Sequence, residues 1–464
     1  MRYGTVLCTA FLLVAPLDGL LAAERPNFVI IMADDLGYGD IGCYGSQRIR
    51  TPHLDQLAAE GMRLTDFHSS GAVCSPTRAG LMTGRYQQRA GIPAVIVADP
   101  KRPTHPHGIQ DREVTFAELL SGAGYKTAIF GKWHLGYYKK YNPVRHGFGQ
   151  FRGYISGNVD FFSHVDQAGR LDWWRDDTVD DEPGYTTHLV TKHSLAFLEA
   201  NRDEPFCLYV PYEPPHYPYQ GPGDKPVRVV GKPRGKAETR QPRADVQRAY
   251  KEMVEEMDKG VGEIVAALKR HRIERKTLVM FFSDNGGTRQ GSNGPLRGFK
   301  GQLWEGGHRV PCIAWWPGTI EAGGVSLALA ITLDVMPTML AAAGVDPPAD
   351  RRLDGVSLLP VLTEGKSLGR RKLFWGHGKS RAMRDGPWKL VASARGQKQP
   401  GLFRLTDDLA EQNDLAEREP FRLKEMMTAI ETWQRDTAAG ASPQPDLPPR
   451  KAEARRGNEE VVRR

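Results

Sequence analysis

One short stretch of the sequence, Cys74-Ser75-Pro76-Thr77-Arg78, places a thiol close to a permanent cation. Pro76 suits the first turn of a helix, where a missing N–H is tolerated, so Cys74 is expected at a helix N-terminus. Arg78 then lies one turn further along the same face. Unpaired N–H groups and the arginine would lower the pKa of the thiol and make it reactive. Two alternatives stay open: conversion of Cys74 to an aldehyde by a maturation enzyme, and a buried cysteine without chemistry.

Two pairs of oxygen-bearing side chains follow apolar runs of the chain. Asp34 and Asp35 come directly after one such run, and Asp284 and Asn285 come after another. Adjacent carboxylates repel each other, and a divalent cation relieves that repulsion. Carboxylate and amide oxygens are ligands that a hard cation prefers, whereas zinc prefers nitrogen or sulfur. The alternative is an ordinary loop that contains an aspartate-capped turn.

Four basic side chains are further candidates for the site: Lys132, His134, His216 and Lys300. Lys132 and His134 lie two residues apart between glycines, so an extended backbone would direct both side chains the same way. The glycines would allow a ligand to approach the backbone closely. His216 lies between prolines that stiffen its loop, and Lys300 precedes a Leu-Trp-Glu-Gly-Gly run. Taken singly, a lysine or histidine at such a position is more often an ordinary surface residue.

The elements that must position these side chains are short buried strands. Continuous apolar runs that suit such strands occupy residues 26–32, 125–130, 205–210, 277–282 and 310–316. Helical patterns occupy residues 51–62, 115–120 and 245–269, and a further helix starts at 334. Four of the strands end in polar residues, and helical stretches separate them. The pattern predicts an α/β sheet whose site lies at the carboxyl ends of the strands.

The chain divides into four parts by composition. Residues 1–23 have the charged start and apolar centre of a signal peptide, and residues 24–366 form the predicted catalytic domain. From residue 367 the pattern changes to short strands separated by turns and then a helix at 420–437, which predicts a small α+β subdomain over 367–440. Residues 441–464 are expected to be a disordered basic tail.

Composition excludes several classes of protein. The net charge of +8 comes from the segments 225–243 and 450–464, which carry +6 and +3 and lack interleaved aromatic residues, so nucleic-acid binding is not expected. The cysteines are scattered singly, without the spacing of a disulfide framework or a zinc site. Beyond the leader no apolar stretch is long enough to span a bilayer. With no Asn-x-Ser/Thr sequon, the leader indicates a periplasmic or secreted bacterial protein.

Together these motifs resemble, in order and in wording, the signatures of the type I (formylglycine-dependent) sulfatases. The similarity runs from about residue 26 to residue 405 and includes the C-terminal stretch 384–390. It implies an alkaline-phosphatase-like α/β fold with a large mixed, mostly parallel sheet flanked by helices. A small C-terminal α+β subdomain with an antiparallel sheet would complete it. The implied activity is hydrolysis of a sulfate monoester, on a sulfated carbohydrate or an aryl sulfate.

The resemblance also assigns a role to each matching residue. Asp34, Asp35, Asp284 and Asn285 would bind one Ca²⁺ together with Cys74, after a formylglycine-generating enzyme has converted that cysteine to 3-oxoalanine; Mg²⁺ is the less favoured ion. The hydrated aldehyde would attack sulfur, and its second hydroxyl would then expel the sulfate. His134 would be the base for that step, and Arg78 would hold the diol and the metal ligands. Lys132 and Lys300 would bind the sulfate oxygens, and His216 with Lys300 would protonate the leaving alcohol. Ser156 falls near a polar family position but matches too loosely to be included.

Two other functions compete with this interpretation. A phosphodiesterase or phosphonate monoester hydrolase of the same superfamily is disfavoured by the lysine pair and by the Gly-Lys-Trp-His-Leu-Gly match. A non-catalytic carbohydrate-binding relative is disfavoured because every expected catalytic residue type is present. Two segments are candidates for holding a sulfated sugar: 173–175, by stacking of its tryptophans, and the basic loop 225–243, by charge. Each has the alternative of being an ordinary surface feature.

Overall fold

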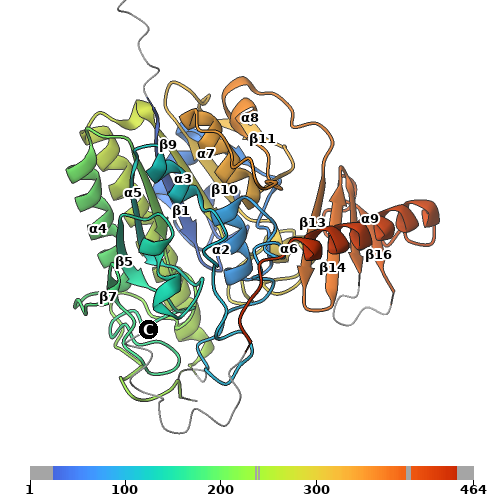
Figure 1. Cartoon of the computed structure of the whole chain (residues 1–464). Coiled ribbons are helices and arrows are strands. Elements are labelled where there is room, and N and C mark those ends of the chain that lie inside the picture. The colour runs from blue at the N-terminus through green and yellow to red at the C-terminus, as the bar shows by residue number, and fades with distance from the viewer. Residues whose placement is uncertain (1–24, 236–237, 239–240, 393–398, 447–464) are drawn as a thin grey trace, which may run out of the picture.

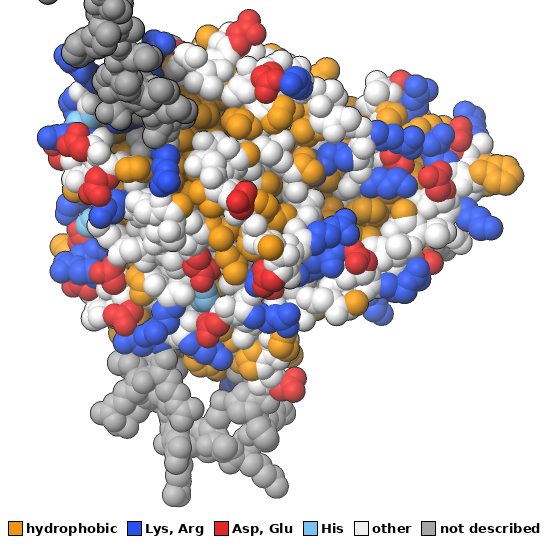
Figure 2. Space-filling view, turned by 45° about the horizontal axis from the view of Figure 1, so that its top comes forward, with side chains coloured by type: hydrophobic (Ala, Val, Ile, Leu, Met, Phe, Trp, Pro, Cys, Tyr) orange, Lys and Arg blue, Asp and Glu red, His pale blue; other side chains and the backbone are white. Residues whose placement is uncertain are grey.

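The computed structural model describes residues 25–235, 238, 241–392 and 399–446. The predicted signal peptide and residues 447–464 of the predicted tail lie outside these residues. Within the described residues, no helix is long and apolar enough to cross a bilayer. On the face shown in Figure 2, Lys and Arg side chains are interspersed with Asp and Glu, so that this face carries no continuous basic surface.

A ten-stranded sheet forms the centre of the predicted catalytic domain, in the order β11-β2-β10-β9-β1-β8-β4-β5-β6-β7. Its strands are β1 (Asn27–Ala33), β2 (Met62–Leu64), β4 (Lys126–Lys132), β5 (Gln150–Tyr154), β6 (Trp174–Arg175), β7 (Thr178–Val179), β8 (Phe206–Pro211), β9 (Thr277–Ser283), β10 (Cys312–Trp315) and β11 (Gly324–Ser326). The five central strands β9, β1, β8, β4 and β5 are parallel. β10 is antiparallel to β9, which makes the sheet mixed. The predicted mostly parallel α/β fold is confirmed.

Helices cover both faces of this sheet (Figure 1). They are α1 (Pro52–Glu60), α2 (Cys74–Thr83), α3 (Phe116–Gly122), α4 (Thr186–Asn201), α5 (Arg243–Arg270), α6 (Glu305–His308), α7 (Val335–Ala343) and α8 (Leu359–Glu364). Alternate residues of β1 divide between the two cores, because successive side chains of a strand point to opposite faces. Phe28, Ile30 and Met32 belong to the core that contains residues of α2, α3 and α7. Val29 and Ile31 belong to the core that contains residues of α1, α4 and α5, which explains why β1 is apolar throughout.

A short parallel pair of strands, β3 (Phe67–His68) and β12 (Ala330–Ile331), stands apart from the main sheet. The helix expected over residues 51–62 ends at Glu60. Gly61 follows it, and Met62 then pairs with Ala314 in the sheet. The strand expected over 310–316 is limited to the four residues of β10.

The C-terminal subdomain is a separate lobe beside the catalytic domain (Figure 1). Its four-stranded antiparallel sheet consists of β13 (Lys372–His377), β14 (Ser380–Asp385), β15 (Trp388–Ala392) and β16 (Gly401–Arg404). Helix α9 (Pro420–Ala439) packs on this sheet through Met426 and Ile430, which contact the apolar side chains of β14, β15 and β16. The predicted antiparallel subdomain with a closing helix is therefore confirmed.

The chain after α9 returns to the catalytic domain. The Ser442 N–H donates to the Arg89 carbonyl at 2.7 Å, and the Gln444 side chain accepts from the Gly108 N–H at 3.0 Å. Ser442 is buried. The prediction of a disordered tail from residue 441 is therefore wrong for residues 441–446, because backbone and side-chain groups of this segment bond to Arg89 and Gly108.

Candidate active site

The carboxyl ends of the parallel strands bring the predicted oxygen ligands together. β1 pairs with β9 in a register that places Ala33 opposite Ser283, so Asp34 and Asp284 leave the sheet side by side. Their backbones are tied to neighbouring chain ends: the Asp284 N–H donates to the Ala33 carbonyl at 3.0 Å, and the Asp34 N–H donates to the Pro214 carbonyl at 3.1 Å. All of these residues are buried or nearly so.

Cys74 is the first residue of α2, a helix whose ten residues are all buried. Its Sγ lies 3.5 Å from Asp34 Oδ1 and 3.3 Å from Lys300 Nζ. Burial and the Asp34 charge raise the pKa of the thiol to about 12. The expectation that the helix N-terminus and Arg78 would acidify this thiol is therefore wrong for the unmodified cysteine, since desolvation and a neighbouring carboxylate outweigh both.

Four oxygen-bearing side chains surround this cysteine: Asp34, Asp35, Asp284 and Asn285. The Asn285 Nδ2 donates to Asp35 Oδ1 at 2.8 Å, while Asn285 Oδ1 is buried and has no hydrogen-bond partner within the described residues. A buried amide oxygen without a donor among three carboxylates fits a hard divalent cation. Asp35 has a φ of +68°, an uncommon conformation for a residue other than glycine and one that clusters at functional sites.

Three cations, two of them buried and Lys300 partly exposed, pair with the three carboxylates. Lys132 Nζ pairs with Asp34, Lys300 Nζ lies 2.5 Å from Asp35 Oδ1, and Arg78 Nη2 lies 3.0 Å from Asp284 Oδ2. Burial would raise the pKa of Asp34, but Lys132 and the other nearby cations hold it well below its usual value. Burial and the charge of Asp34 raise the pKa of Asp284 to about 7. The three cations therefore do not fully relieve the repulsion between Asp284 and Asp34, and a metal cation would relieve it further.

Lys132 and His134 reach the site differently from the prediction. Lys132 ends β4, but the backbone is no longer extended at His134, whose φ is +57°. The His134 Nε2–H donates to the Ile96 carbonyl at 2.8 Å, and Nδ1 is left without a partner within the described residues. Burial, reinforced by the charge of Lys132, holds the pKa of His134 well below its usual value. The ring is therefore neutral, with a free acceptor at Nδ1.

In His216 the roles of the two ring nitrogens are reversed relative to His134. Its Nδ1–H donates to the Tyr217 carbonyl at 2.7 Å, and Nε2 lies 3.8 Å from Asp35 Oδ2. The imidazole stacks on the Tyr217 ring with centroids 4.6 Å apart. Burial lowers the pKa of His216 to about 4, although the charge of Asp34 opposes the shift. All ten predicted site side chains thus lie in one buried cluster or border it.

Comparison with known proteins shows the family of the whole chain. A sequence model of the sulfatase family matches residues 26–345, and one described as "N-sulphoglucosamine sulphohydrolase, C-terminal" matches residues 299–434. The chain belongs to the sulfatase family. It is 34% identical to N-acetylgalactosamine-6-sulfatase of Mus musculus over 87% of this chain and 78% of the relative. It is 36% identical to arylsulfatase A of Homo sapiens over 78% and 73%.

Solved structures agree with this assignment. The crystal structure of Ps i-CgsB in complex with k-i-k-neocarrahexaose superposes with a TM-score of 0.80 at 27% identity, over 91% of this sulfatase and 95% of that chain. PsFucS1 sulfatase from Pseudoalteromonas sp. superposes with a TM-score of 0.72 at 26% identity, over 91% and 92%. The protein is therefore a sulfatase enzyme, with the alkaline-phosphatase-like fold that the sequence predicts.

The two segments expected to hold a sugar differ in how accessible their side chains are in this sulfatase. Trp173 is completely buried and stacks on His164, so its predicted role in stacking on a sugar is wrong. The basic loop is partly structural, since buried Arg228 pairs with Glu238 at 2.8 Å. Its Arg234, however, lies over the ring of Tyr217 and lines a cavity of about 680 Å³ together with Arg289.

Sequence reasoning missed the backbone group that orients His134. The Ile96 carbonyl accepts the His134 Nε2–H, and the Ile96 N–H in turn donates to Ser75 Oγ at 3.1 Å, next to the cysteine. The loop that carries Ile96 thereby ties the candidate base to the start of α2. A backbone carbonyl has no side-chain signature, so only the fold reveals this contact.

Proposed function

We propose that this sulfatase removes sulfate from a sulfated carbohydrate, using a formylglycine made from Cys74 and a bound Ca²⁺. The observation that carries the proposal is the position of the Cys74 Sγ, between Lys300 Nζ at 3.3 Å and Asp34 Oδ1 at 3.5 Å. A nucleophile formed at this position has a cation for the substrate on one side and metal ligands on the other.

Asp34, Asp35, Asp284 and Asn285 would hold the ion, and the unpartnered Asn285 Oδ1 supports that set. When bound, the cation and the hydrated aldehyde supply an activated oxygen nucleophile. Ca²⁺ is favoured over Mg²⁺, because the donors are all oxygens from a crowded protein cage and Mg²⁺ usually retains several waters.

The remaining side chains would act on protons and charge. Lys132 and Lys300 would bind the sulfate oxygens, where preorganised charge lowers the barrier most. Arg78, which donates to the Lys132 carbonyl at 3.0 Å, would keep the lysine-bearing strand end and Asp284 in place. His134 is neutral and would accept a proton at Nδ1.

His216 would protonate the leaving alcohol from Nε2. Its lowered pKa in the substrate-free site disfavours the protonated ring. An anionic sulfate ester bound beside Nε2 adds a negative charge that raises this pKa, so the acid would be charged in the enzyme–substrate complex.

A carbohydrate substrate is supported by the relatives and by the surroundings of His216. The relatives include a protein named for N-acetylgalactosamine 6-sulfate and a structure that contains a neocarrahexaose. In this chain, the cavity beside Tyr217 is lined by Arg234 and Arg289, and Arg289 lies over the ring of Phe299, the neighbour of Lys300. Guanidinium groups held on aromatic rings suit an anionic sugar next to the scissile ester.

The rest of the proposal concerns the whole chain. Residues 24–366 would form the catalytic domain and residues 367–440 the small subdomain. The segment 1–23 would direct export to the periplasm or the medium of a bacterium, with a formylglycine-generating enzyme as the maturation partner.

Coexpression with a formylglycine-generating enzyme tests the proposal. The peptide that contains Cys74 should lose one sulfur and two hydrogens and gain one oxygen in mass spectrometry. Matured protein should hydrolyse an aryl sulfate and members of a panel of sulfated oligosaccharides. Full activity with an alkylatable thiol at Cys74 would contradict the formylglycine. Faster turnover of aryl phosphate or phosphonate esters would favour a phosphodiesterase or phosphonate hydrolase instead.

A further inference from the structure

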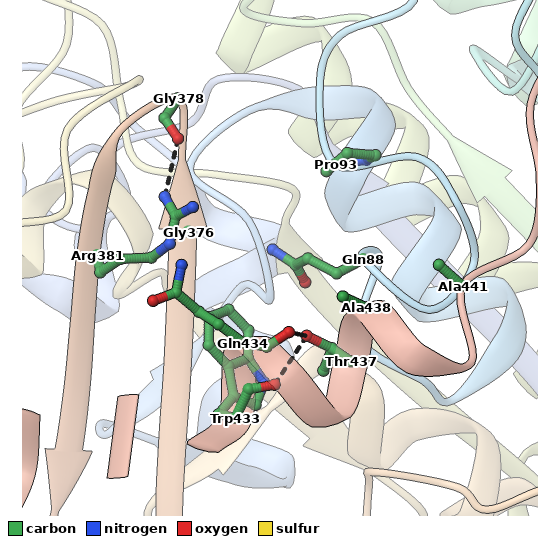
Figure 3. A pocket seen from close by; sticks show the side chains of 10 residues that line it. All are labelled: Gln88, Pro93, Gly376, Gly378, Arg381, Trp433, Gln434, Thr437, Ala438 and Ala441. Atoms are coloured by element: carbon green, nitrogen blue, oxygen red, sulfur yellow. Dashed lines mark hydrogen bonds between the residues drawn. The ribbon is translucent and has the colours of Figure 1, made fainter. Parts of the chain in front are cut away.

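A cleft of about 350 Å³ lies where the C-terminal subdomain meets the catalytic domain. Its walls come from the loop after α2, the β13–β14 hairpin and the end of α9. Figure 3 shows the side chains of Gln88, Arg381 and Gln434 directed toward the same space from these three segments. The volume falls in the range of small-ligand sites, and junctions between domains are common places for them. None of its residues has a part in the proposed hydrolysis.

Trp433 contributes a hydrogen-bond donor that the chain does not satisfy. The indole is only 7% exposed, and its Nε1 has no hydrogen-bond partner within the described residues. Phe374 stacks on it with centroids 5.4 Å apart and an interplanar angle of 7°, and Tyr86 packs edge-on at 5.3 Å. These rings fix the indole, so the N–H cannot turn to solvent. A buried donor of this kind is rare in folded proteins, and an acceptor from outside the chain would satisfy it.

Arg381 contributes a charge without a counter-ion. Its Nη1 donates to the carbonyls of Gly378 at 2.8 Å and Ser380 at 2.7 Å. With its amide oxygen facing the guanidinium, Gln434 accepts from Nε at 2.7 Å and Nη2 at 3.1 Å. All of these acceptors are neutral, and no ion pair joins Arg381 to a carboxylate within the described part of the chain. Burial, with no acidic neighbour opposing it, lowers the pKa of Arg381. An anion would supply the missing charge.

Gly376 brings these groups to a common point. A Cβ at this position would lie 3.2 Å from Gln88 Nε2, 3.4 Å from Trp433 Cη2 and 3.5 Å from Arg381 Cδ. The three segments therefore meet closely at this glycine, where a larger residue would press on all three side chains. Gln88 Oε1 is a further buried polar atom with no partner within the described residues. The side-chain amide of Gln88 is thus free to bond a ligand.

We propose that this cleft binds one sugar unit of a polyanionic carbohydrate through the sulfate or carboxylate group of that unit. Arg381 and the Trp433 Nε1–H bind the oxyanion, and the Gln88 amide bonds a hydroxyl. Pro93, Ala438 and Ala441 line the remainder of the cleft and leave apolar contact for the C–H groups of the ring. A free sulfate ion would leave that part empty. The identity of the ligand rests on the proposed function, whereas the site itself takes no part in catalysis.

Binding can be measured on the full chain produced without the maturation enzyme, so that turnover does not interfere. The probes are hexasaccharides of chondroitin sulfate, heparin and carrageenan, a chemically desulfated chondroitin hexasaccharide that keeps its carboxylates, and inorganic sulfate, each titrated by calorimetry. Arg381→Gln removes the charge, and Trp433→Phe removes the N–H donor together with part of the buried ring. Arg435→Gln is the matched control, because Arg435 is an exposed arginine on α9, the helix that carries Trp433.

At least one sulfated hexasaccharide should bind, and its dissociation constant should rise about tenfold or more in Arg381→Gln and severalfold in Trp433→Phe. The control should bind like wild type, and all variants should remain folded at the temperature of the titration. Retained binding of the desulfated probe would identify carboxylate as the ligand group, and its loss would identify sulfate. Equal affinities in all variants, or no binding of any hexasaccharide, would overturn the proposal. So would inorganic sulfate that binds as tightly as the sugars. Aryl sulfate turnover by matured variants tests the proposed function separately, because it should be unchanged in all three.

Discussion

At the scale of single residues, Asp34 and Asp35 each have two expected partners, a lysine and a metal cation. Asp34 and Asp35 pair with Lys132 and Lys300 in the chain as described, yet the same oxygens are the proposed ligands of the cation. A cation bound by these carboxylates would weaken their hold on the two lysines. The ammonium groups would then be available for sulfate oxygens, so metal binding and sulfate binding are expected to reinforce each other.

The roles of His216 and Lys132 can be separated by the choice of leaving group. General acid catalysis contributes about a hundred- to ten-thousand-fold, but an activated phenol leaves readily as its anion. His216→Ala should therefore lose roughly that factor in kcat/KM on a sugar sulfate and much less on an aryl sulfate. Lys132→Ala removes charge that both substrates need, so its two losses should be similar. Equal losses for His216→Ala on both substrates would show that His216 binds sulfate and is not the acid.

Asn285 can be tested without any turnover. Its unpartnered Oδ1 is a proposed ligand, so Asn285→Ala should bind Ca²⁺ less tightly than wild type. A ligand that binds only the folded state raises its stability with concentration, and the rise depends on the dissociation constant. The melting temperature can be measured at increasing Ca²⁺ concentrations. For the same rise in melting temperature, Asn285→Ala should need a Ca²⁺ concentration at least about tenfold higher than wild type. Asn201→Ala, at the end of α4, is the control. An unchanged Ca²⁺ response in Asn285→Ala would remove this residue from the ligand set.

The residues of the site were predictable because each polar group follows an apolar run or lies in a short motif. The environment of those residues was not. The thiol of Cys74 has a raised pKa because it is buried and because β1 brings Asp34 beside it, a contact between positions 40 residues apart. The positive φ of His134 and its bond to the Ile96 carbonyl have no sequence signal, because neither involves a side-chain type that favours them.

At the scale of elements, continuous apolar runs predicted the central strands well, since parallel strands covered on both faces need apolar residues throughout. The same runs do not specify direction, so the antiparallel β10 could not be predicted. Helix α4 was missed altogether. Its buried face includes Thr187, Thr191 and Ser194. The Thr191 hydroxyl bonds to the Thr187 carbonyl and to Tyr212, and the Ser194 hydroxyl bonds to the Val190 carbonyl. Polar residues on a buried face obscure the amphipathic pattern from which a helix is recognised.

The start of α1 depends on a carboxylate from another helix. Asp258 of α5 accepts the N–H groups of Leu54 at 2.8 Å and His53 at 3.1 Å. Burial raises its pKa from 3.8 to about 6. Folding therefore favours the protonated acid. The stability that this proton contributes is full below pH 3.8 and is lost as the pH rises through about 6.

Asp258→Asn should remove this pH dependence. Between pH 4 and pH 7, the free energy of unfolding of the wild type should fall relative to that of the variant by on the order of 2 kcal/mol. Chemical denaturation of both proteins at several pH values measures the difference, and titration of all other groups cancels. Two parallel stability curves would show that Asp258 has no raised pKa.

At the scale of the whole molecule, a buried network of charges joins the two domains. Lys389 of β15 lies 2.7 Å from Glu305 Oε1 of α6, and Arg384 of β14 lies 3.2 Å from Glu305 Oε2. Arg384 also pairs with Asp66 of the catalytic domain at 3.1 Å. Sequence similarity drew attention to the stretch 384–390, but its partners lie about 80 residues or more away. The pairing could therefore be known only from the fold.

The network should control how the subdomain is held. Glu305→Ala takes the nearer of two carboxylates from the buried Lys389, which keeps Glu411 Oε1 at 3.5 Å, and it removes one bond of Arg384. Removal of one partner of a buried pair typically costs about 3–5 kcal/mol. We expect the free energy of unfolding to fall by about that amount, measured by chemical denaturation. Glu305→Leu combined with Lys389→Met removes both charges of the closest pair, and replacing both partners by apolar groups is often close to neutral. Because buried Glu411 loses its lysine in this double variant, we expect it to recover only part of the loss. The Asp66 pair with Arg384 remains in that double variant. A loss below about 1 kcal/mol in Glu305→Ala would show that apolar packing, and not this network, holds the two domains together.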